Sequence, residues 1–568
     1  MRVRATRLRV AGATAALCWA SLWVTGHSAA AAPAAPACMP TASGRELLAN
    51  PGFEGGSSAR AGSWGDNTWG GAAAAYARDT ASPHGGASAQ RIHVASLQSG
   101  GVIFKQDVAL KAGAVYQASV WLRSPDAATV DFELRRAGPN YEAGADQRVT
   151  IGPTWQRYTI RGGFSADTPA YFGIDFDTPG TVEADDAGLR RLSDTRCVAS
   201  TAPIPSTYLG MHLNKWGTYT VWPGMLDFGT VRLWDTGTRW TDVEPQPGTW
   251  NWSRLDYYVN AAVTNHDAII YTMGMTPQWA SARPADAKNG AVAEPADMGA
   301  WRRYVHAVAT RYRGRIRYWE IWNEADYAGF YDGSTQELVA LTRAAEEELK
   351  AVDPANVVLS PDFTTGGLDA MSEFLADGGG RYIDVMSVHL YPRTTPEADR
   401  PFFVAVQDIM RHAGIAAKPL WNTEGAAGDV TSTAAVAAGL VARTYLLQWA
   451  WGVSNFDAYA WDIAIGGALS RSDHITPTAA GVAYEQVADW LRGSRMLSRT
   501  HTADGTWEIA LRRPDGSLAH AVWNVNGTTT FTVPAGWGAH ATRDLSGRTR
   551  AIVRDVIAIG TGPQLLTP

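Results

Sequence analysis

Two glutamates, Glu324 and Glu424, stand at the ends of apolar segments and offer the clearest chemistry in this chain. Glu324 closes the segment YWEIWNE and Glu424 follows PLWNT, and an asparagine lies one or two positions before each of them. Two facing carboxyl groups can cleave a glycosidic bond, because one protonates the departing oxygen and the other meets the positive charge at the anomeric carbon. A single carboxyl group leaves that charge unsupported. The pair therefore indicates glycoside hydrolysis.

Eight short apolar segments are expected to form the strands that position these glutamates. Amphipathic helical stretches, such as 298–313, 336–352 and 431–452, separate the segments. Eight strand–helix units over about 285 residues fit a (β/α)8 TIM barrel, whose usual length is about 250 residues. Reacting groups in such barrels lie at the carboxyl ends of strands, where Glu324 (fourth) and Glu424 (seventh) stand. The segments are LGMHL (209–213), TVRLW (230–234), AIIYTMG (268–274), YWEIWNE (318–324), VVLSPD (357–362), VMSVHLY (385–391), PLWNTEG (419–425) and FDAYAW (456–461).

An open, doubly wound sheet is the structural alternative for the same alternation of strands and helices. That fold usually carries a Gly-rich phosphate turn after its first strand, and GMHLNKWG supplies none. A Ser–His–Asp esterase is the alternative chemistry, but no G-x-S-x-G sequence occurs at a predicted strand end. The barrel with its pair of glutamates is the preferred interpretation.

Other polar side chains are predicted to support the pair. His389 and Tyr391 share one face of the sixth strand, because side chains alternate along a strand. Tyr391 is placed to donate a hydrogen bond to a nucleophilic carboxylate, and Arg232 is placed as a second donor or a sugar ligand. His389 fits a sugar contact and a hydrogen-bonded core position equally well. Glu320 shares the face of Glu324 but lies deeper, so we expect it to pair with Arg232.

Aromatic residues are unusually frequent, with 24 Trp and 20 Tyr. Flat rings with a polar handle suit the faces of sugars, but they also suit large β-rich cores, so composition alone does not decide between them. Trp279 and Trp461, near the ends of the third and eighth strands, are the candidates for a sugar-stacking floor. Packing in the core is the alternative for both.

The segments YWEIWNEADY, PLWNTEGA and RLWDTGTRWTDVEPQPGTWNWSRLD resemble clan A glycoside hydrolases, and within that clan they are most similar to family 39. The resemblance implies that Glu324 is the general acid/base, Glu424 the nucleophile, and Asn323 the ligand of the sugar 2-hydroxyl. Ala325 departs from the pattern, because many relatives have proline there. A retaining mechanism places the carboxyl groups about 5–5.5 Å apart. It also calls for a raised pKa at the acid, Glu324.

Family 39 contains β-xylosidases, α-L-iduronidases and enzymes that trim exopolysaccharides or arabinogalactans. The resemblance therefore implies a pentose-directed enzyme of the xylosidase or arabinosidase type, acting on a plant or microbial polysaccharide. An endo-acting β-glycanase is the second interpretation. A non-catalytic polysaccharide-binding protein and a transglycosylase using the same residues stay open.

Residues 44–198 are rich in short alternating runs separated by Gly, Pro and Asp turns, which predicts a β-sandwich or jelly roll. The segments LLANPGFEGG (47–56) and EADDAGLRRL (183–192) resemble the ends of carbohydrate-binding modules of the family 4 and 9 type. The resemblance implies a structural calcium ion held by Glu54 and Asp185. The candidate sugar platforms of this module are Trp64, Trp69, Tyr141 and Trp155, with core or edge packing as the alternative for each.

Residues 1–32 have the basic start, apolar run and small residues of a secretory signal peptide. The apolar run of about 15 residues is shorter than the roughly 20 that a spanning helix needs. Residues 33–43 form a linker in this interpretation, and the mature chain is secreted. Cys38 and Cys197 then form a disulfide in the oxidising extracellular compartment, or remain as two free thiols.

The barrel is predicted to occupy residues 204–493 and a small C-terminal β-sandwich residues 494–568. No HExxH, CxxC, P-loop or dinucleotide motif is present, so no catalytic cofactor is expected. Without the signal peptide, 45 of the 49 basic residues remain against 55 acidic residues, which argues against nucleic-acid binding. The expected partner is a polysaccharide or oligosaccharide substrate, with no membrane contact in the mature form. The oligomeric state stays open.

Overall fold

The computed structural model describes residues 42–138, 140–193, 198–223, 228–286, 290–392, 394–426, 433–464 and 467–568. The predicted signal peptide and linker, and both cysteines of the predicted disulfide, lie outside these residues. Among the helices that are described, none combines the length and the apolar character needed to cross a membrane.

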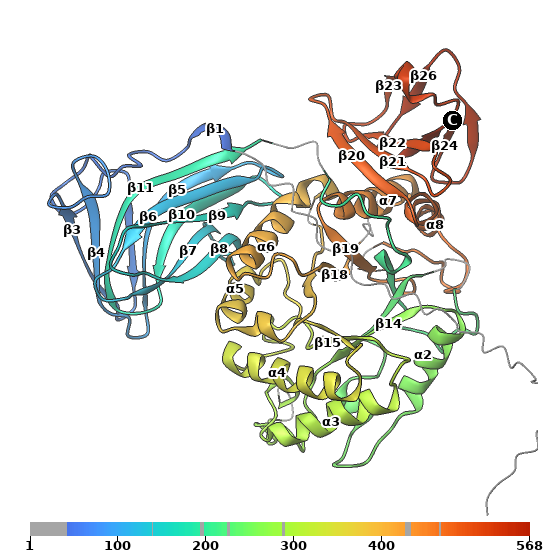
Figure 1. Cartoon of the computed structure of the whole chain (residues 1–568), viewed down its shortest axis with the longest axis horizontal. Coiled ribbons are helices and arrows are strands. Elements are labelled where there is room, and N and C mark those ends of the chain that lie inside the picture. The colour runs from blue at the N-terminus through green and yellow to red at the C-terminus, as the bar shows by residue number, and fades with distance from the viewer. Residues whose placement is uncertain are drawn as a thin grey trace, which may run out of the picture. The chain divides into compact units, whose positions relative to one another are not determined.

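The eight segments predicted as strands form one parallel sheet that closes into a barrel (Figure 1). The hydrogen-bonded order is β16–β15–β14–β13–β12–β19–β18–β17. Parallel bridges from Leu359 to Val385 and from Phe363 to Val388 join the two outer strands. The strands are β12 (Leu209–His212), β13 (Thr230–Leu233), β14 (Ala268–Met273), β15 (Tyr318–Ile321), β16 (Val357–Leu359), β17 (Met386–His389), β18 (Leu420–Gly425) and β19 (Val453–Ala458).

Helices connect these strands and cover the outside of the barrel. The helix α4 begins with a capping box, in which Ser334 Oγ accepts the Glu337 N–H over 3.2 Å and the Glu337 carboxylate accepts the Ser334 N–H over 2.9 Å. The helices are α1 (Trp240–Val243), α2 (Ser253–Thr264), α3 (Met298–Arg311), α4 (Thr335–Val352), α5 (Leu368–Ala376), α6 (Arg400–His412), α7 (Ala434–Ala450) and α8 (Ala479–Leu491).

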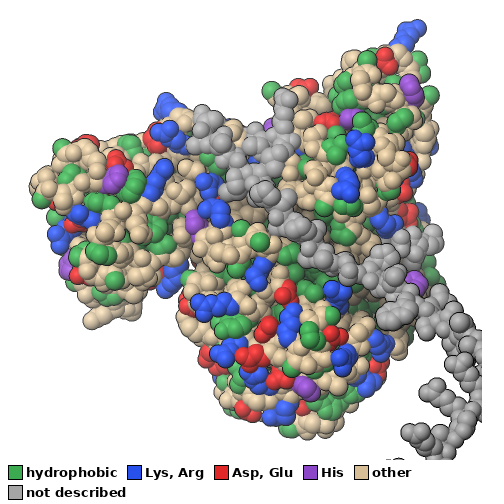
Figure 2. All heavy atoms as spheres, in the orientation of Figure 1, with side chains coloured by type: hydrophobic (Ala, Val, Ile, Leu, Met, Phe, Trp, Pro, Cys, Tyr) green, Lys and Arg blue, Asp and Glu red, His purple; other side chains and the backbone are tan. Residues whose placement is uncertain are grey.

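Charged side chains of both signs are interspersed over the barrel helices that Figure 2 shows. Arg302 of α3 pairs with Glu347 and Glu348 of α4, and Arg343 pairs with Glu347 along α4 itself. Exposed pairs of this kind contribute little stability, about 0–1 kcal/mol each. Their mixed signs are typical of a solvated surface.

Every residue of β12, β13, β15 and β17 is buried, because helices cover the outer face and side chains fill the interior. The interior is not purely apolar. Arg232 on β13 and Glu320 on β15 are both 0% exposed. Buried charges persist only when they are paired and hydrogen-bonded, so these two residues mark the region where the polar site forms.

The N-terminal region consists of two antiparallel sheets around a shared core that contains Phe53, Phe104 and Phe172. One sheet has the order β3–β4–β11–β6–β9, with β1 paired to β11, and the other, here the five-strand sheet, has the order β2–β5–β10–β7–β8. The strands are β1 (Ala42–Glu46), β2 (Gly65–Trp69), β3 (Ala73–Asp79), β4 (Ala89–Ser96), β5 (Gly101–Leu110), β6 (Tyr116–Arg123), β7 (Thr129–Arg136), β8 (Ala143–Thr150), β9 (Gln156–Gly162), β10 (Thr168–Phe176) and β11 (Gly180–Leu192).

These sheets contact two helices of the barrel. Arg161 of β9 donates from its backbone N–H and its guanidinium to Asp408 of α6, over 2.8 and 3.0 Å. Both terminal nitrogens of Arg135 on β7 lie 3.2 Å from the carboxylate of Asp369 on α5. Ion pairs therefore join the N-terminal sheets to the barrel.

The C-terminal region adds a six-strand sheet, β20–β21–β22–β27–β24–β25, and a separate pair, β23–β26. Trp523 on β22 donates to Glu397 over 2.8 Å, and Arg443 of α7 donates to the same carboxylate over 3.1 Å. The strands are β20 (Arg495–His501), β21 (Thr506–Arg512), β22 (Leu518–Asn524), β23 (Thr529–Thr532), β24 (Ala541–Arg543), β25 (Thr549–Ala551), β26 (Val556–Ile559) and β27 (Gln564–Thr567).

Candidate active site

The carboxyl ends of β15, β17 and β18 bring the two predicted glutamates together. One carboxylate oxygen of Glu324, one of Glu424 and a ring nitrogen of His389 all lie within 4.8 Å of one another. Glu424 is buried, with 7% of its surface exposed, and Glu324 is partly exposed. The barrel therefore presents two carboxyl groups at one point, as the strand-end positions predicted.

Glu424 is held by hydrogen-bond donors on both oxygens. Arg232 Nη1 donates to its Oε2 over 2.8 Å, and the Tyr391 hydroxyl donates to its Oε1 over 2.7 Å. Burial raises the pKa of Glu424 above its usual value, although His389 and Arg232 oppose that rise. The two donors fix the orientation of the carboxylate and stabilise its charged form.

Glu324 follows β15 in a strained turn. Trp322 and Glu324 adopt φ angles of 73° and 44°, in the left-handed region that costs a non-glycine residue of order 1–3 kcal/mol. The turn is held by two hydrogen bonds, from the Trp322 indole to the Phe330 carbonyl over 2.8 Å and from the Glu324 N–H to Asp362 Oδ1 over 2.7 Å. Such strain is typical of functional positions, because the surrounding contacts must maintain it.

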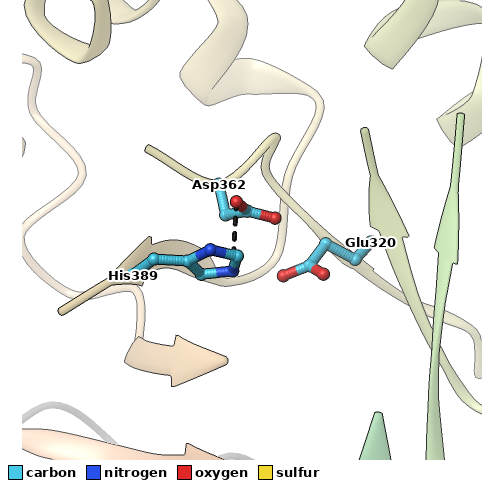
Figure 3. A group of neighbouring side chains, drawn as sticks. All are labelled: Glu320, Asp362 and His389. Carbon is cyan, nitrogen blue, oxygen red and sulfur yellow. Dashed lines mark ion pairs between the residues drawn. The ribbon is translucent and has the colours of Figure 1, made fainter. Parts of the chain in front are cut away.

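His389 lies between two carboxyl groups. Its Nδ1 is 3.1 Å from Glu324 Oε1, and its Nε2 is 3.0 Å from Asp362 Oδ1, the ion pair drawn in Figure 3. Burial lowers the pKa of His389, but the charges of Asp362 and Glu424 outweigh burial and raise it to about 9. His389 is therefore cationic at neutral pH.

The order of the two glutamate pKa values differs from the sequence prediction. We expected a raised pKa at Glu324. Burial does act in that direction, but the hydrogen bond and the charge of His389 lower the pKa of Glu324 below its usual value. Asp362, which the sequence analysis left unassigned, makes the largest electrostatic contribution to the raised pKa of His389, although burial also raises the pKa of Asp362 itself well above its usual value. The transferable proton therefore lies on His389, next to Glu324.

Arg232 hydrogen-bonds to several polar side chains of the site at once. Its Nε donates to Glu320 Oε2 over 2.6 Å, and its Nη2 donates to Asn323 Oδ1 over 2.8 Å and to Asp362 Oδ2 over 3.0 Å. The predicted pairing of Glu320 with Arg232 is confirmed. Glu320 is also saturated by the hydroxyls of Thr272, Ser387 and Thr423, at 2.6–2.7 Å.

Two groups in this network have the spacing of metal ligands, namely Glu320–Asp362–His389 and Glu324–His389–Glu424. Arg232 contacts a carboxylate of both groups, and cationic His389 belongs to both. These positive charges already neutralise the carboxylates and repel a metal ion. The donor set fits proton transfer better than metal binding.

The two predicted sugar-stacking tryptophans lie in packed surroundings. Trp461 is 1% exposed and its indole donates to the His474 carbonyl over 2.8 Å. Trp279 is partly buried, donates to the Glu244 carbonyl over 3.0 Å and packs edge-on against Trp240. The structure thus brings the polar candidates together and places these two rings against the core. Their role in sugar binding stays a prediction.

The predicted calcium ligands converge on one loop of the N-terminal sheets. Both oxygens of Glu54 lie 3.0 Å from the Ala87 N–H, and Asp185 Oδ2 accepts the N–H groups of His84 and Gly85 over 2.9 and 3.0 Å. The carboxylates have the chemistry that calcium prefers. They face backbone N–H donors here, so the fit to a cation is partial.

The four predicted sugar platforms of the N-terminal region fall into three groups. Trp64 is 4% exposed and stacks on Phe104 at 5.2 Å, so it is a core residue. Trp155 is partly covered by the Arg123 guanidinium at 4.7 Å. Trp69 and Tyr141 are 46% and 57% exposed and remain available to a ligand.

Asp362 is the main functional residue that the sequence analysis missed. It follows β16, and the predicted strand VVLSPD (357–362) ends in this residue. The rule that directed attention to Glu324 and Glu424, a polar group at the carboxyl end of a barrel strand, also applies to Asp362.

A family model for glycosyl hydrolase family 10 matches residues 233–337, which include Glu324 and end before Glu424. The chain is 31% identical over 126 residues to endo-1,4-beta-xylanase 3 of Hypocrea jecorina, which covers 22% of this chain and 34% of that protein. It is 23% identical over 183 residues to endo-1,4-beta-xylanase A of Fusarium oxysporum f. sp. lycopersici, covering 29% and 54%. The chain thus spans about half or less of these curated relatives.

Solved structures match much more of the chain. A family 39 glycoside hydrolase from the gut symbiont Bacteroides cellulosilyticus WH2 aligns with a TM-score of 0.54 at 16% identity, over 82% of this chain and 97% of that one. The barrel has the fold of clan A glycoside hydrolases. A monomeric beta-xylosidase from Caulobacter crescentus CB15 aligns with a TM-score of 0.50 at 15% identity, over 66% and 98%.

Proposed function

We propose that this chain is a secreted, retaining glycoside hydrolase that cleaves O-glycosidic bonds of a plant or microbial polysaccharide. The observation that carries the proposal is the pair of carboxyl groups, Glu324 and Glu424, with oxygens within 4.8 Å. Retaining enzymes hold their carboxyl groups about 5–5.5 Å apart, whereas inverting enzymes need about 6.5–9.5 Å for an intervening water. The short spacing supports a double displacement.

In the first step, Glu424 attacks the anomeric carbon and the bond from that carbon to the leaving oxygen breaks. Arg232 and Tyr391 hold Glu424 charged and oriented for this attack. The leaving oxygen takes a proton from Glu324, which itself receives that proton from His389 Nδ1 at 3.1 Å, so that Glu324 is left as a carboxylate and His389 as a neutral imidazole. The products are the shortened leaving group and a glycosyl ester on Glu424.

In the second step, water attacks the anomeric carbon of the ester. Glu324, now a carboxylate, accepts the proton of that water, and Glu424 departs as a carboxylate. Two inversions give net retention. The same pair of groups thus acts as acid in one step and base in the next.

A pentose-containing chain is the proposed substrate. The two curated relatives are named endo-1,4-beta-xylanases, and one structural relative is titled a beta-xylosidase. These names support xylose-containing chains, and the two xylanase names favour an endo-acting β-glycanase as the second candidate. Both candidates use the same two glutamates.

Secretion, the Cys38–Cys197 disulfide and a calcium ion at Glu54 and Asp185 are further parts of this proposal. The basic and apolar N-terminus supports export. Calcium should raise the melting temperature of the purified protein and the chelator EGTA should lower it. A melting temperature that neither addition changes contradicts a structural calcium ion.

Activity on a defined panel tests the proposed function. The panel comprises 4-nitrophenyl xyloside, arabinoside and glucoside, with arabinoxylan and arabinogalactan as polymers. The wild-type chain is expected to release sugar from at least one pentose-containing substrate, while the Glu324→Gln/Glu424→Gln double variant releases none. Equal product from both proteins would show a contaminating activity, and no product from either would overturn the proposal.

A further inference from the structure

A cavity of about 970 Å³ lies between the five-strand sheet and the barrel. This volume is at the upper end of the range of ligand sites, about 300–1,000 Å³. The catalytic residues do not line it. Its lining residues from the sheet region are Asn67, Trp69, Ile103, Asp131, Arg135, Tyr141, Arg148, Tyr171 and Asp175, and those from the barrel are Asp326, Gly366, Asp369, Ala370 and Glu373.

One complete row of the five-strand sheet lines the cavity. Asn67, Ile103, Asp175, Asp131 and Arg148 are direct partners on the successive strands β2, β5, β10, β7 and β8. Neighbouring strands lie about 4.8 Å apart, so the row extends about 19 Å across the sheet. An elongated row of mainly polar side chains, with Ile103 as the apolar member, suits a chain-like ligand better than a small compact one.

Glycines leave space at the face of the sheet that lines this cavity. A Cβ on Gly173 would lie 3.1 Å from both Ile103 and Tyr171, so any larger residue would crowd the face. A Cβ on Gly101 would lie 2.3 Å from the Trp69 ring, so glycine allows the indole to rest directly on the sheet. Trp69 is still 46% exposed, which leaves ring surface free for a ligand.

The chemistry of the lining fits a neutral carbohydrate. Aromatic rings pack against the apolar faces of sugar rings, and carboxylates and guanidiniums bond pairs of hydroxyls. The lining contains five carboxylic acids against two arginines, and burial raises the pKa of Asp131 to about 8 and that of Asp175 to about 7, so the lining carries little net charge at neutral pH and suits an uncharged ligand. A metal ion is not indicated, because the metal-like clusters among the described residues lie in the barrel centre and not in this cavity.

The residues that follow Glu324 in the sequence link the cavity to the turn that holds Glu324. Asp326 stands two residues after Glu324, and its carboxylate accepts the N–H and the hydroxyl of Thr364 over 2.8 and 2.5 Å. Arg135 and Asp369 of α5, which both line the cavity, are held in place by their ion pair. A ligand in the cavity therefore contacts the loop that holds the acid/base residue.

We propose that this cavity is a distal subsite that binds a neutral part of the polysaccharide beyond the bond being cleaved. The sheet region and the barrel both contribute residues to it. The inference rests on the proposed function, because it assigns the subsite to the substrate of Glu324 and Glu424. Long chains gain binding from this subsite, and short substrates do not reach it.

The test compares a polymer with a short substrate in variants of the full chain. Trp69→Ala and Tyr141→Ala, singly and together, are assayed on arabinoxylan and on 4-nitrophenyl β-xyloside. The expected result for the double variant is a loss of at least about tenfold in kcat/KM on the polymer, with the xyloside value within about twofold of wild type. Tyr257→Ala on α2 is the matched control, because Tyr257 is 43% exposed and does not line the cavity.

Calorimetry of the inactive Glu424→Gln chain with xylohexaose provides a second measurement that needs no turnover. The same aromatic substitutions in that background should weaken binding about tenfold, and polygalacturonate should compete poorly. Unchanged polymer kinetics and unchanged xylohexaose affinity in the double variant overturn the subsite. Absence of hydrolysis by the wild-type chain overturns the proposed function instead, and the binding measurement then still decides the subsite.

Discussion

His389 Nδ1 lies 3.1 Å from Glu324 Oε1, and the opposite nitrogen of the ring lies 3.0 Å from Asp362. This arrangement places an imidazolium behind Glu324, the proposed general acid. In this account the acid is a pair of residues that share one proton, and the Asp362 carboxyl group favours the protonated form of His389. Glutamate alone, flanked by a second carboxyl group, would need a raised pKa of its own to do the same work.

The pH dependence of activity should reveal this pair. The raised pKa of His389, about 9, predicts that kcat/KM falls as pH rises through about 9, because the shared proton is then lost. On the acidic side, the raised pKa of Glu424 predicts that activity falls at a higher pH than for an ordinary glutamate. In His389→Asn the basic limb should move to lower pH, and in Asp362→Asn it should move in the same direction. A basic limb unmoved in both variants contradicts the shared proton.

Replacement of the nucleophile should remove turnover without unfolding the chain. Glu424→Gln keeps the size of the side chain but loses the charge that attacks the anomeric carbon. We expect kcat to fall by about 10⁴-fold or more, with an unchanged circular dichroism spectrum. Glu346→Gln on α4 is the matched control and should keep wild-type activity. Near-normal turnover in Glu424→Gln would remove the nucleophile assignment.

Replacement of the acid should depend on the leaving group. Glu324→Gln is expected to slow cleavage of alkyl glycosides by about 10²–10⁴-fold, because their leaving oxygen needs a proton. Dinitrophenyl glycosides leave without protonation, so their cleavage should be much less affected. Equal losses on both substrates would indicate a role for Glu324 other than proton donation.

Glu320 is predicted to act on stability as well as on the site. It accepts hydrogen bonds from Arg232 and from the hydroxyls of Thr272, Ser387 and Thr423 at full burial. Glu320→Ala leaves the Arg232 charge with fewer partners and should lower the free energy of unfolding by about 3–5 kcal/mol. Glu320→Gln keeps the size and most hydrogen bonds, so its loss should be smaller. Urea unfolding measures the free energy of unfolding of both variants. Values equal to that of the wild-type chain would show that the pairing of Glu320 with Arg232 is not needed for stability.

The sequence predicted the barrel well because each of its strands is a short apolar run bounded by turns or by amphipathic helices. The ends of those runs also located Glu324 and Glu424, since polar groups at the carboxyl ends of barrel strands meet at one mouth. The N-terminal alternation likewise indicated antiparallel sheets. These features depend on local patterns, which a single sequence carries.

Other features depend on contacts between distant segments and could not be predicted in the same way. The pKa of Glu324 is set by His389 and, behind it, by Asp362, residues 65 and 38 positions away. Trp461 ends a predicted strand, yet only the packed structure shows that its ring is 1% exposed. A strand-end position fixes where a residue lies along the barrel, but not whether its side chain faces the open mouth.

The anomeric configuration of the first product tests the central claim most directly. Proton NMR follows the cleavage of whichever panel substrate the wild-type chain hydrolyses fastest, before mutarotation equalises the anomers. Two successive displacements at Glu424 predict a product with the same configuration as the substrate. A product of inverted configuration would contradict the account, because it requires direct attack by water and leaves no covalent ester on Glu424.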